Sequence, residues 1–237
     1  MYHLYNGNVG DTMTKENVKG VLQLLFSVAI YYIVSNYFYD ILNKINIHVP
    51  KDQTIWFELG KYILIALLVF LIYRSQIKGS KHKYAKNRLM SIIFSVGAFV
   101  VLVLANYVLH RIIFLFHDVG GFGFVNYFAN PFTLNSIIEM IIDIIIKPFI
   151  LIVLFPLGVS NIVKNATTAS IVSGLLYGII YALGLHTTIE IAFFIVLVPS
   201  LIMMLITYLY KTNNSIWMVY VSYVLYIAFG SFVLRYF

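Results

Sequence analysis

The sequence predicts an all-α protein, a polytopic bundle of about seven transmembrane helices. Composition is the first observation behind this prediction, because 61% of the 237 residues are hydrophobic and only 11% are charged. A soluble domain is about half apolar and roughly a quarter charged. The second observation is that the apolar residues form long continuous runs rather than alternating, which favours helices over strands. We expect one membrane-embedded domain over residues 1–237, with six to eight spans.

Seven apolar runs account for the expected helices. A helix needs about 20 mainly apolar residues to cross a hydrocarbon layer of ~30 Å, inside which unpaired peptide groups cost several kcal/mol. The fifth run is short, and Pro148 and Pro156 interrupt the fourth, which we expect either as one span or as a broken one. In chain order, the runs cover residues 20–42, 56–74, 90–116, 135–158, 169–185, 188–210 and 216–235.

Basic residues mark the loops on one side of the predicted bundle. The predicted loop 74–88 contains six Lys or Arg and no acid, whereas the predicted loops 117–134 and 186–188 on the opposite side contain neither Lys nor Arg. The positive-inside rule then predicts a multi-pass cell-membrane protein with a cytoplasmic N-terminus and an extracytoplasmic C-terminus. The net charge of +7 indicates contact with lipid headgroups rather than nucleic acid. Further basic residues on the predicted cytoplasmic side are Lys15, Lys19, Lys164 and Lys211.

Ionisable residues inside the apolar runs are the first candidates for a site, because charges at membrane depth are costly. Glu139, Asp143 and Lys147 recur every four residues, so they share roughly one face of the fourth helix, where Asp143 can pair with Lys147. We expect this stripe to face the bundle interior or a water-filled cavity, either fixing helix packing or serving as an acid/base, ion or partner site. Glu58 and Lys61 predict an interfacial ion pair, with Lys61 reaching toward the headgroups.

Other patterns in the chain predict packing rather than chemistry. The fifth run carries Ser173, Gly174 and Gly178 at helical spacing, which permits close approach of a neighbouring helix. The chain contains no Cys, which removes thiol nucleophiles and Cys-ligated metals. The nearby pairs His117 with Asp118 and His186 with Glu190 supply too few ligands for a metal site. Common catalytic and phosphate-binding motifs do not occur, so we expect no metal and no cofactor.

The order of elements in residues 135–237 resembles a known family. A Pro-containing helix over 147–158 is followed by a short basic turn and a small-residue helix that includes 173–181. A further apolar helix ends in Tyr-x-Tyr-Lys-Thr-x-x-Ser-Ile-Trp at 208–217, which leads into a final helix. This order is similar to that of the CAAX-protease and bacteriocin-processing (Abi) family of intramembrane glutamate proteases. The resemblance covers about 40% of the chain and implies that family's helical core.

The family's catalytic signature is degenerate in this chain. The resemblance implies a Glu-Glu-x-x-x-Arg, a Phe-x-x-x-His and a terminal His-x-x-x-Asn or Asp motif, which together activate water for peptide hydrolysis. Leu and Ile cannot accept a proton, and a Tyr of pKa ~10 is a poor general base at neutral pH. The aligned positions hold Leu151 and Ile152 for the paired glutamates, Pro156 near the arginine, Tyr177 for the Phe, Tyr181 for the His and Tyr223 near the last His.

These substitutions predict a binding protein built on a protease-like fold. Its expected role is as a regulatory or scaffolding partner of another membrane or cell-envelope protein, or as a bacteriocin self-immunity protein. An interior cleft lined by Tyr177, Tyr181 and Tyr223 would serve packing or hold a partner segment. One alternative is a divergent intramembrane endopeptidase of the CAAX type that uses Glu139 or Asp143. Another is a small transporter or channel subunit. The expected partners are the lipid bilayer, a membrane protein and, as an alternative partner, a second copy of the chain.

Overall fold

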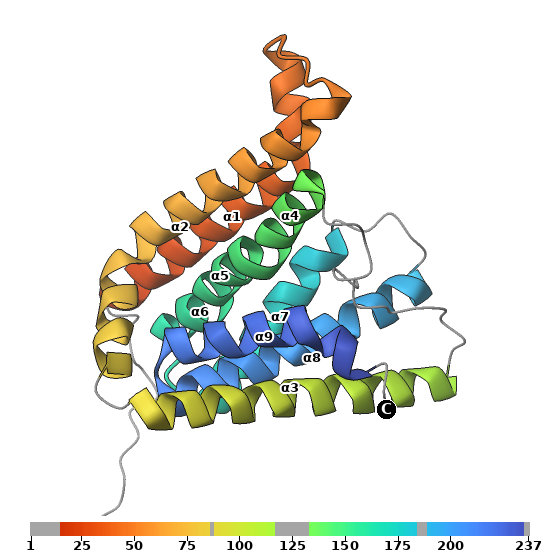
Figure 1. Cartoon of the computed structure of the whole chain (residues 1–237). Coiled ribbons are helices and arrows are strands. Elements are labelled where there is room, and N and C mark those ends of the chain that lie inside the picture. Colours follow the sequence, from red (N-terminus) through yellow and green to blue (C-terminus); the bar gives the residue numbers. More distant parts are fainter. Residues whose placement is uncertain (1–14, 86–87, 117–132, 184–188, 235–237) are drawn as a thin grey trace, which may run out of the picture.

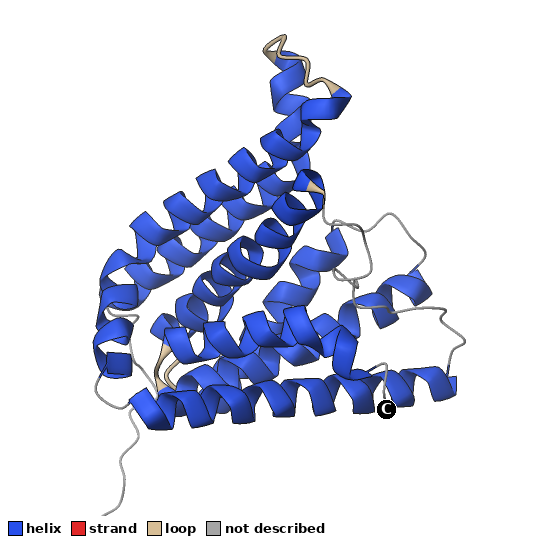
Figure 2. Ribbon diagram, viewed as in Figure 1, coloured by secondary structure: helices blue, strands red, loops and turns tan. Residues whose placement is uncertain are grey.

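The chain folds into a bundle in which helices account for all regular secondary structure of the described residues (Figure 2). The computed structural model describes residues 15–85, 88–116, 133–183 and 189–234. Each of the seven predicted runs corresponds to a helix in these ranges, which confirms the predicted fold class. Six of them are α1 (Lys15–Lys44), α2 (Thr54–Ala85), α3 (Arg88–Phe116), α7 (Ala166–Leu183), α8 (Ile189–Asn213) and α9 (Ile216–Leu234).

The fourth run forms one continuous helix, called here the central helix, over residues 134–162. Two π-helical segments widen it, and each lies at a proline: the first ends just before Lys147-Pro148, and the second contains Pro156. Proline lacks an N–H group and its ring clashes with the carbonyl four residues earlier, so a wider turn keeps the helix unbroken. Its parts are α4 (Leu134–Met140), η2 (Ile141–Ile146), α5 (Lys147–Ile152), η3 (Val153–Leu157) and α6 (Gly158–Ile162).

The central helix forms the core of the bundle. Its residues 150–160 are all buried, which is the pattern of a helix surrounded by neighbours. The α1–α2 hairpin contacts it on one side, and α7, α8 and α9 contact it from the other (Figure 1). The remaining helix, α3, packs mainly against α9.

Small residues bring α7 and α8 into close contact, as their spacing predicts. A Cβ atom placed on Gly174 would lie 2.6 Å from the Ser200 backbone oxygen and would clash with the Met204 side chain. At the same interface, the buried Thr207 hydroxyl donates a hydrogen bond of 2.7 Å to the Ser173 hydroxyl. Small-residue packing and an interhelical hydrogen bond are the two devices that hold helices together in lipid.

Several helix ends meet at one end of the bundle, which we call the basic end. There α1 begins, α2, α6 and α8 end, and α9 starts. The Ile216 backbone N–H donates to the Ser80 hydroxyl at 2.5 Å, and the Lys211 ammonium group donates to the Ser160 carbonyl at 3.2 Å. The predicted loop 74–88 was wrong in part, because α2 continues through four of its six basic residues to Ala85. Lys and Gln are good helix formers, so the end of the apolar run does not end the helix.

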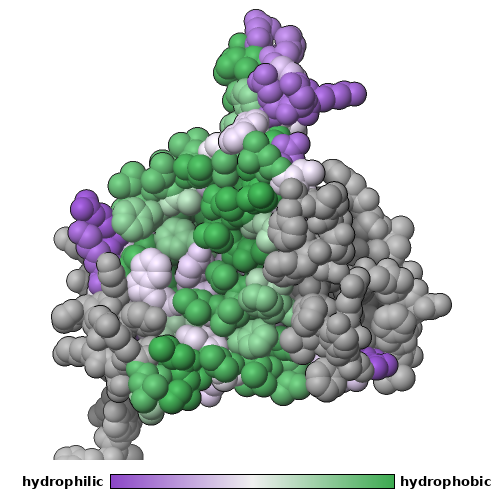
Figure 3. Space-filling model, viewed as in Figure 1, coloured by the Kyte–Doolittle hydropathy of each residue, from purple (hydrophilic) through white to green (hydrophobic). Residues whose placement is uncertain are grey.

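Five helices in the described ranges are long and apolar enough to cross a membrane. Side chains on their outer faces are apolar and exposed, and Figure 3 shows a mainly hydrophobic surface with hydrophilic residues at the tip of the α1–α2 hairpin. An exposed surface of this kind places the helices in a lipid bilayer. The five spans are Asn17–Lys44, Lys51–Ser80, Ile92–Leu109, Ala166–Leu183 and Val196–Asn213.

Candidate functional site

An ion pair on α2 is the most deeply buried charged group of the site. The Lys61 ammonium group lies 2.7 Å from the carboxylate of Glu58, one helical turn away, and its side chain is only 5% exposed. Three aromatic rings surround this ammonium group, with ring centres at 6.0 Å for Phe38, 5.6 Å for Tyr39 and 4.8 Å for Tyr62. The expectation that Lys61 reaches toward the headgroups was therefore wrong. The rings offer the cation π faces inside the protein, which favours burial.

A second ion pair lies on the central helix. The Lys147 ammonium group is 2.6 Å from the Asp143 carboxylate, across the boundary between η2 and α5. This confirms the pairing that their four-residue spacing predicts. Both side chains are about one-third exposed, so this pair is wetter than the one on α2. Glu139, the third member of the predicted stripe, is exposed at the start of the central helix rather than facing the interior with them.

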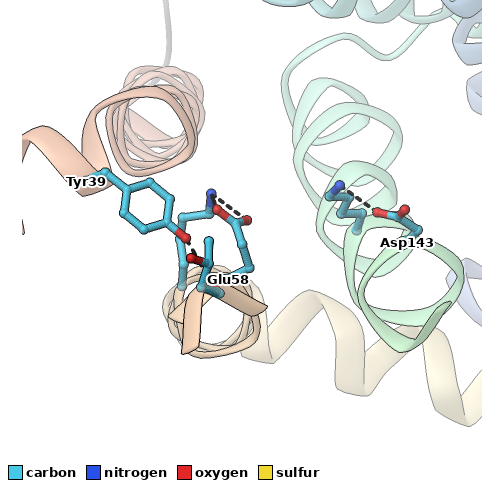
Figure 4. A network of polar contacts seen from close by, with 6 residues as sticks. Tyr39, Glu58 and Asp143 are labelled. Carbon is cyan, nitrogen blue, oxygen red and sulfur yellow. Dashed lines mark hydrogen bonds and ion pairs between the residues drawn. The ribbon is translucent and has the colours of Figure 1, made fainter. Parts of the chain in front are cut away.

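Tyr62 connects the two ion pairs. The ammonium groups of Lys61 and Lys147 each lie 4.8 Å from the centre of its ring, although the lysines belong to different helices. Tyr39 of α1 points toward the start of α2, where its hydroxyl donates a hydrogen bond of 3.3 Å to the Thr54 carbonyl (Figure 4). The cluster therefore joins α1, α2 and the central helix through charged and aromatic groups.

A group of tyrosines extends the site between α1, α7 and α9. Tyr177 on α7 and Tyr223 and Tyr226 on α9 belong to one cluster of buried residues, and Tyr31 on α1 packs against it. The rings of Tyr177 and Tyr181 have centres 6.0 Å apart, and those of Tyr223 and Tyr226 stack with centres 5.9 Å apart. The structure thus brings the predicted tyrosines together and adds Tyr31 and Tyr226, which sequence reasoning missed.

The positions aligned with the protease signature lie mostly in the core. Leu151, Ile152 and Tyr223 belong to one cluster of buried residues with Tyr177, whose ring centre is 5.2 Å from that of Phe155. Pro156 is buried within η3. Tyr181 departs from the prediction, because 39% of its surface is exposed and it lines the edge of the group rather than an interior cleft. These side chains are aliphatic or phenolic, and their arrangement supports packing.

Some predicted residues fall outside the description. His117, Asp118 and His186 lie beyond the described residues, and Glu190 lies on α8 in a stretch whose side chains are not described. Within the described part of the chain, no three His, Asp or Glu side chains gather into a metal-binding group.

The sequence gives only weak evidence that Tyr31 on α1 and Tyr62 on α2 belong to the site. Tyr31 and Tyr62 are polar residues inside apolar runs, and a buried Tyr usually directs its hydroxyl to a partner.

No family model, curated protein or solved structure matches this chain.

Proposed function

We propose that this chain is a non-catalytic integral membrane protein that acts by binding. Its role is that of a regulatory or scaffolding partner of another membrane or cell-envelope protein, or of a bacteriocin self-immunity protein. The observation that carries the proposal is that two carboxylates within the apolar helices are already paired. The Glu58 carboxylate lies 2.7 Å from the Lys61 ammonium group, and the Asp143 carboxylate lies 2.6 Å from that of Lys147. A carboxylate whose charge a neighbouring ammonium group already compensates is poorly placed to take a proton from water.

Lateral association in the bilayer requires an extended surface. Hydrogen bonds between membrane helices average only ~0.6 kcal/mol, so binding depends on close packing over several turns. We propose the outer face of α3 for this role. A Cβ atom on Gly97 would meet nothing within 4 Å, so a neighbouring helix can approach the backbone there. The exposed apolar side chains on this helix include Leu89, Ile93, Val96, Val100 and Leu104.

A peptidase assay tests the absence of catalysis. Purified protein in lipid vesicles is incubated with fluorogenic membrane-embedded peptides, alongside the variants Asp143→Asn and Glu139→Gln. We expect no cleavage above that of empty vesicles from any of the three proteins. The matched control is Asp40→Asn, an exposed carboxylate on α1. Cleavage that disappears in Asp143→Asn and persists in Asp40→Asn would overturn the proposal.

Site-specific photocrosslinking in the native membrane tests the binding surface. A photoreactive residue at Val100 or Leu104 on α3 is compared with one at Leu67 or Leu71, which are exposed on α2. We expect discrete protein adducts, with a partner or with a second copy, from the α3 positions alone. Adducts of equal yield from both helices, or only lipid adducts at α3, would contradict the proposed surface.

A divergent intramembrane endopeptidase is the second candidate function. The observation that favours it is that Asp143 lies in η2, because π-helical turns within α-helices occur frequently at functional sites. In that case Asp143 would exchange its lysine partner for a water in the presence of substrate. The same peptidase assay decides between the two functions.

We further propose that the basic end faces the cytoplasm. The support is that Lys19, Lys164 and Lys211 belong to this one end, as the positive-inside rule requires. Because the chain has no Cys, single cysteines report their side without background. We expect a membrane-impermeant maleimide to label Lys51→Cys in intact cells and Lys164→Cys only after lysis. The reverse pattern would contradict this orientation.

A further inference from the structure

A groove between α1 and α2 opens at the basic end of the bundle. Its volume is about 720 Å³, and its walls are mostly apolar. The amide group of Gln23 donates a hydrogen bond of 2.5 Å to the Ile72 carbonyl, which joins the two helices across the groove. The lining residues are Val18, Lys19, Leu22, Gln23, Phe26 and Ile72.

Polarity changes in order along this groove. Lys19 is exposed near the start of α1, and Gln23 follows one turn deeper on the same face. Leu22 and Phe26 carry the apolar wall further into the membrane, and they are 63% and 62% exposed. From the membrane surface inward, the groove therefore presents a cation, an amide and then hydrocarbon. This is the order of groups in a phospholipid, read from its phosphate through its ester groups to its acyl chain.

We propose that the groove binds an anionic phospholipid, with its phosphate on Lys19 and an acyl chain along Leu22, Phe26 and Ile72. Charge complementarity supports this occupant, since Lys19 shares the basic end with Lys164 and Lys211. A basic residue near an anionic membrane surface contributes about 1 kcal/mol. This binding site is independent of the proposed partner function, because it involves neither α3 nor the ion pairs.

A second groove provides an internal comparison. It lies between α3 and α8, has a volume of about 470 Å³, and is lined by apolar side chains that include Val101, Leu104, Val108 and Leu201. Since a lysine belongs to the lining of the α1–α2 groove and none belongs to this one, the two grooves separate the effect of the headgroup from that of the acyl chain. A lipid that entered the α3–α8 groove would find no cation there, so we expect no headgroup preference from it.

Native mass spectrometry of the detergent-purified protein tests the site. Phosphatidylglycerol and phosphatidylcholine with identical acyl chains are titrated separately, and the apparent Kd of the first bound lipid is measured. We expect phosphatidylglycerol to bind about fivefold more tightly, which corresponds to ~1 kcal/mol. Lys19→Gln should abolish this preference. Lys44→Gln, at the opposite end of the same helix, should leave it unchanged. Equal binding of the two lipids by the unaltered protein would overturn the proposal, as would a preference that survives in Lys19→Gln.

Two further arms keep the result interpretable if Lys19→Gln fails to fold. Leu22→Trp fills the α1–α2 groove and should weaken the binding of phosphatidylglycerol, whereas Leu201→Trp, on α8, fills the other groove and should retain the headgroup preference. The opposite pattern would place the lipid elsewhere. Inorganic phosphate should not compete with phosphatidylglycerol at millimolar concentration. Competition at that level would overturn the proposal, because it would indicate a site for free phosphate.

Discussion

The ammonium group of Lys147, on the central helix, lies 4.8 Å from the centre of the Tyr62 ring on α2. This contact joins two elements that are far apart in the sequence, and it joins two ion pairs that would otherwise be separate. Lys61 contacts the same ring at the same distance. Tyr62 and Lys61 are buried, so their contact is poorly hydrated, whereas the Lys147 side chain is about one-third exposed. Its ring therefore links α2 to the central helix.

Replacing Tyr62 should destabilise the protein through its ring and not through its hydroxyl. We expect Tyr62→Leu to lose about 1–2 kcal/mol of unfolding free energy, because a desolvated cation–π contact is worth up to about 2 kcal/mol. Tyr62→Phe keeps the ring and should cost less than half as much. Equilibrium unfolding in mixed detergent micelles measures both. Equal losses in the two variants would show that the cation–π contacts contribute nothing.

The two ion pairs should contribute different amounts to the free energy of unfolding. Glu58→Gln leaves the buried Lys61 ammonium group without its carboxylate, and breaking a buried pair costs about 3–5 kcal/mol. Asp143→Asn breaks a pair that is one-third exposed, so we expect a loss of about 1 kcal/mol or less. The double variant Glu58→Gln with Lys61→Met should recover much of the first loss. Thermal unfolding of the purified protein checks the order, and a larger loss in Asp143→Asn would contradict it.

The contact between α7 and α8 should not tolerate one added methyl group. Gly174→Ala places a Cβ atom 2.6 Å from a backbone oxygen that cannot move aside, and overpacking of this kind costs about 1–3 kcal/mol. Gly97→Ala is the matched control, because open space surrounds that position on α3. Melting temperatures in detergent measure the difference. The close approach of the helices would be refuted if both variants melted at the same temperature.

The hydrogen bond between Thr207 and Ser173 should make a small and measurable contribution. Thr207→Val keeps the shape of the side chain and removes the hydroxyl, which also bonds the Met203 carbonyl of its own helix at 2.9 Å, so we expect a loss of at least the ~0.6 kcal/mol average for an interhelical bond. A double-mutant cycle with Ser173→Ala isolates the interaction, since the two losses should not add. Ser222→Ala is a useful comparison, because Ser222 bonds only within its own helix, to the Met218 carbonyl. Strict additivity in the cycle would argue against the interhelical bond.

The helices could be predicted because each depends on a local property of the sequence. An apolar run of sufficient length must form a helix in lipid, and this identified all seven. The ends were harder. Helix α2 continues to Ala85 because Lys and Gln prolong a helix as readily as apolar residues do. Whether Pro148 and Pro156 break the fourth helix was left open, since a proline can either end a helix or be absorbed by a wider turn.

The site was predictable only where its partners are close in sequence. The pair of Asp143 and Lys147 follows from four-residue spacing on one helix. The direction of Lys61 does not, because it depends on rings supplied by α1, and the position of Phe38 relative to α2 is a property of the folded hairpin. Tyr31 and Tyr226 were missed for the same reason. Which residues a tyrosine in an apolar run contacts depends on how distant helices pack, and the local sequence does not determine that packing.

The hydrogen bond from the Ile216 backbone to Ser80 has a consequence for biogenesis. These two residues are 136 positions apart, so the hydrogen bond at the end of α2 can form only after the start of α9 has been translated. The Ser95 hydroxyl of α3 likewise donates to the Met218 carbonyl. Early segments therefore enter the bilayer before the helix that completes them exists. A chain truncated before residue 216 would lack both hydrogen bonds and would leave these surfaces of α2 and α3 open to quality-control proteases.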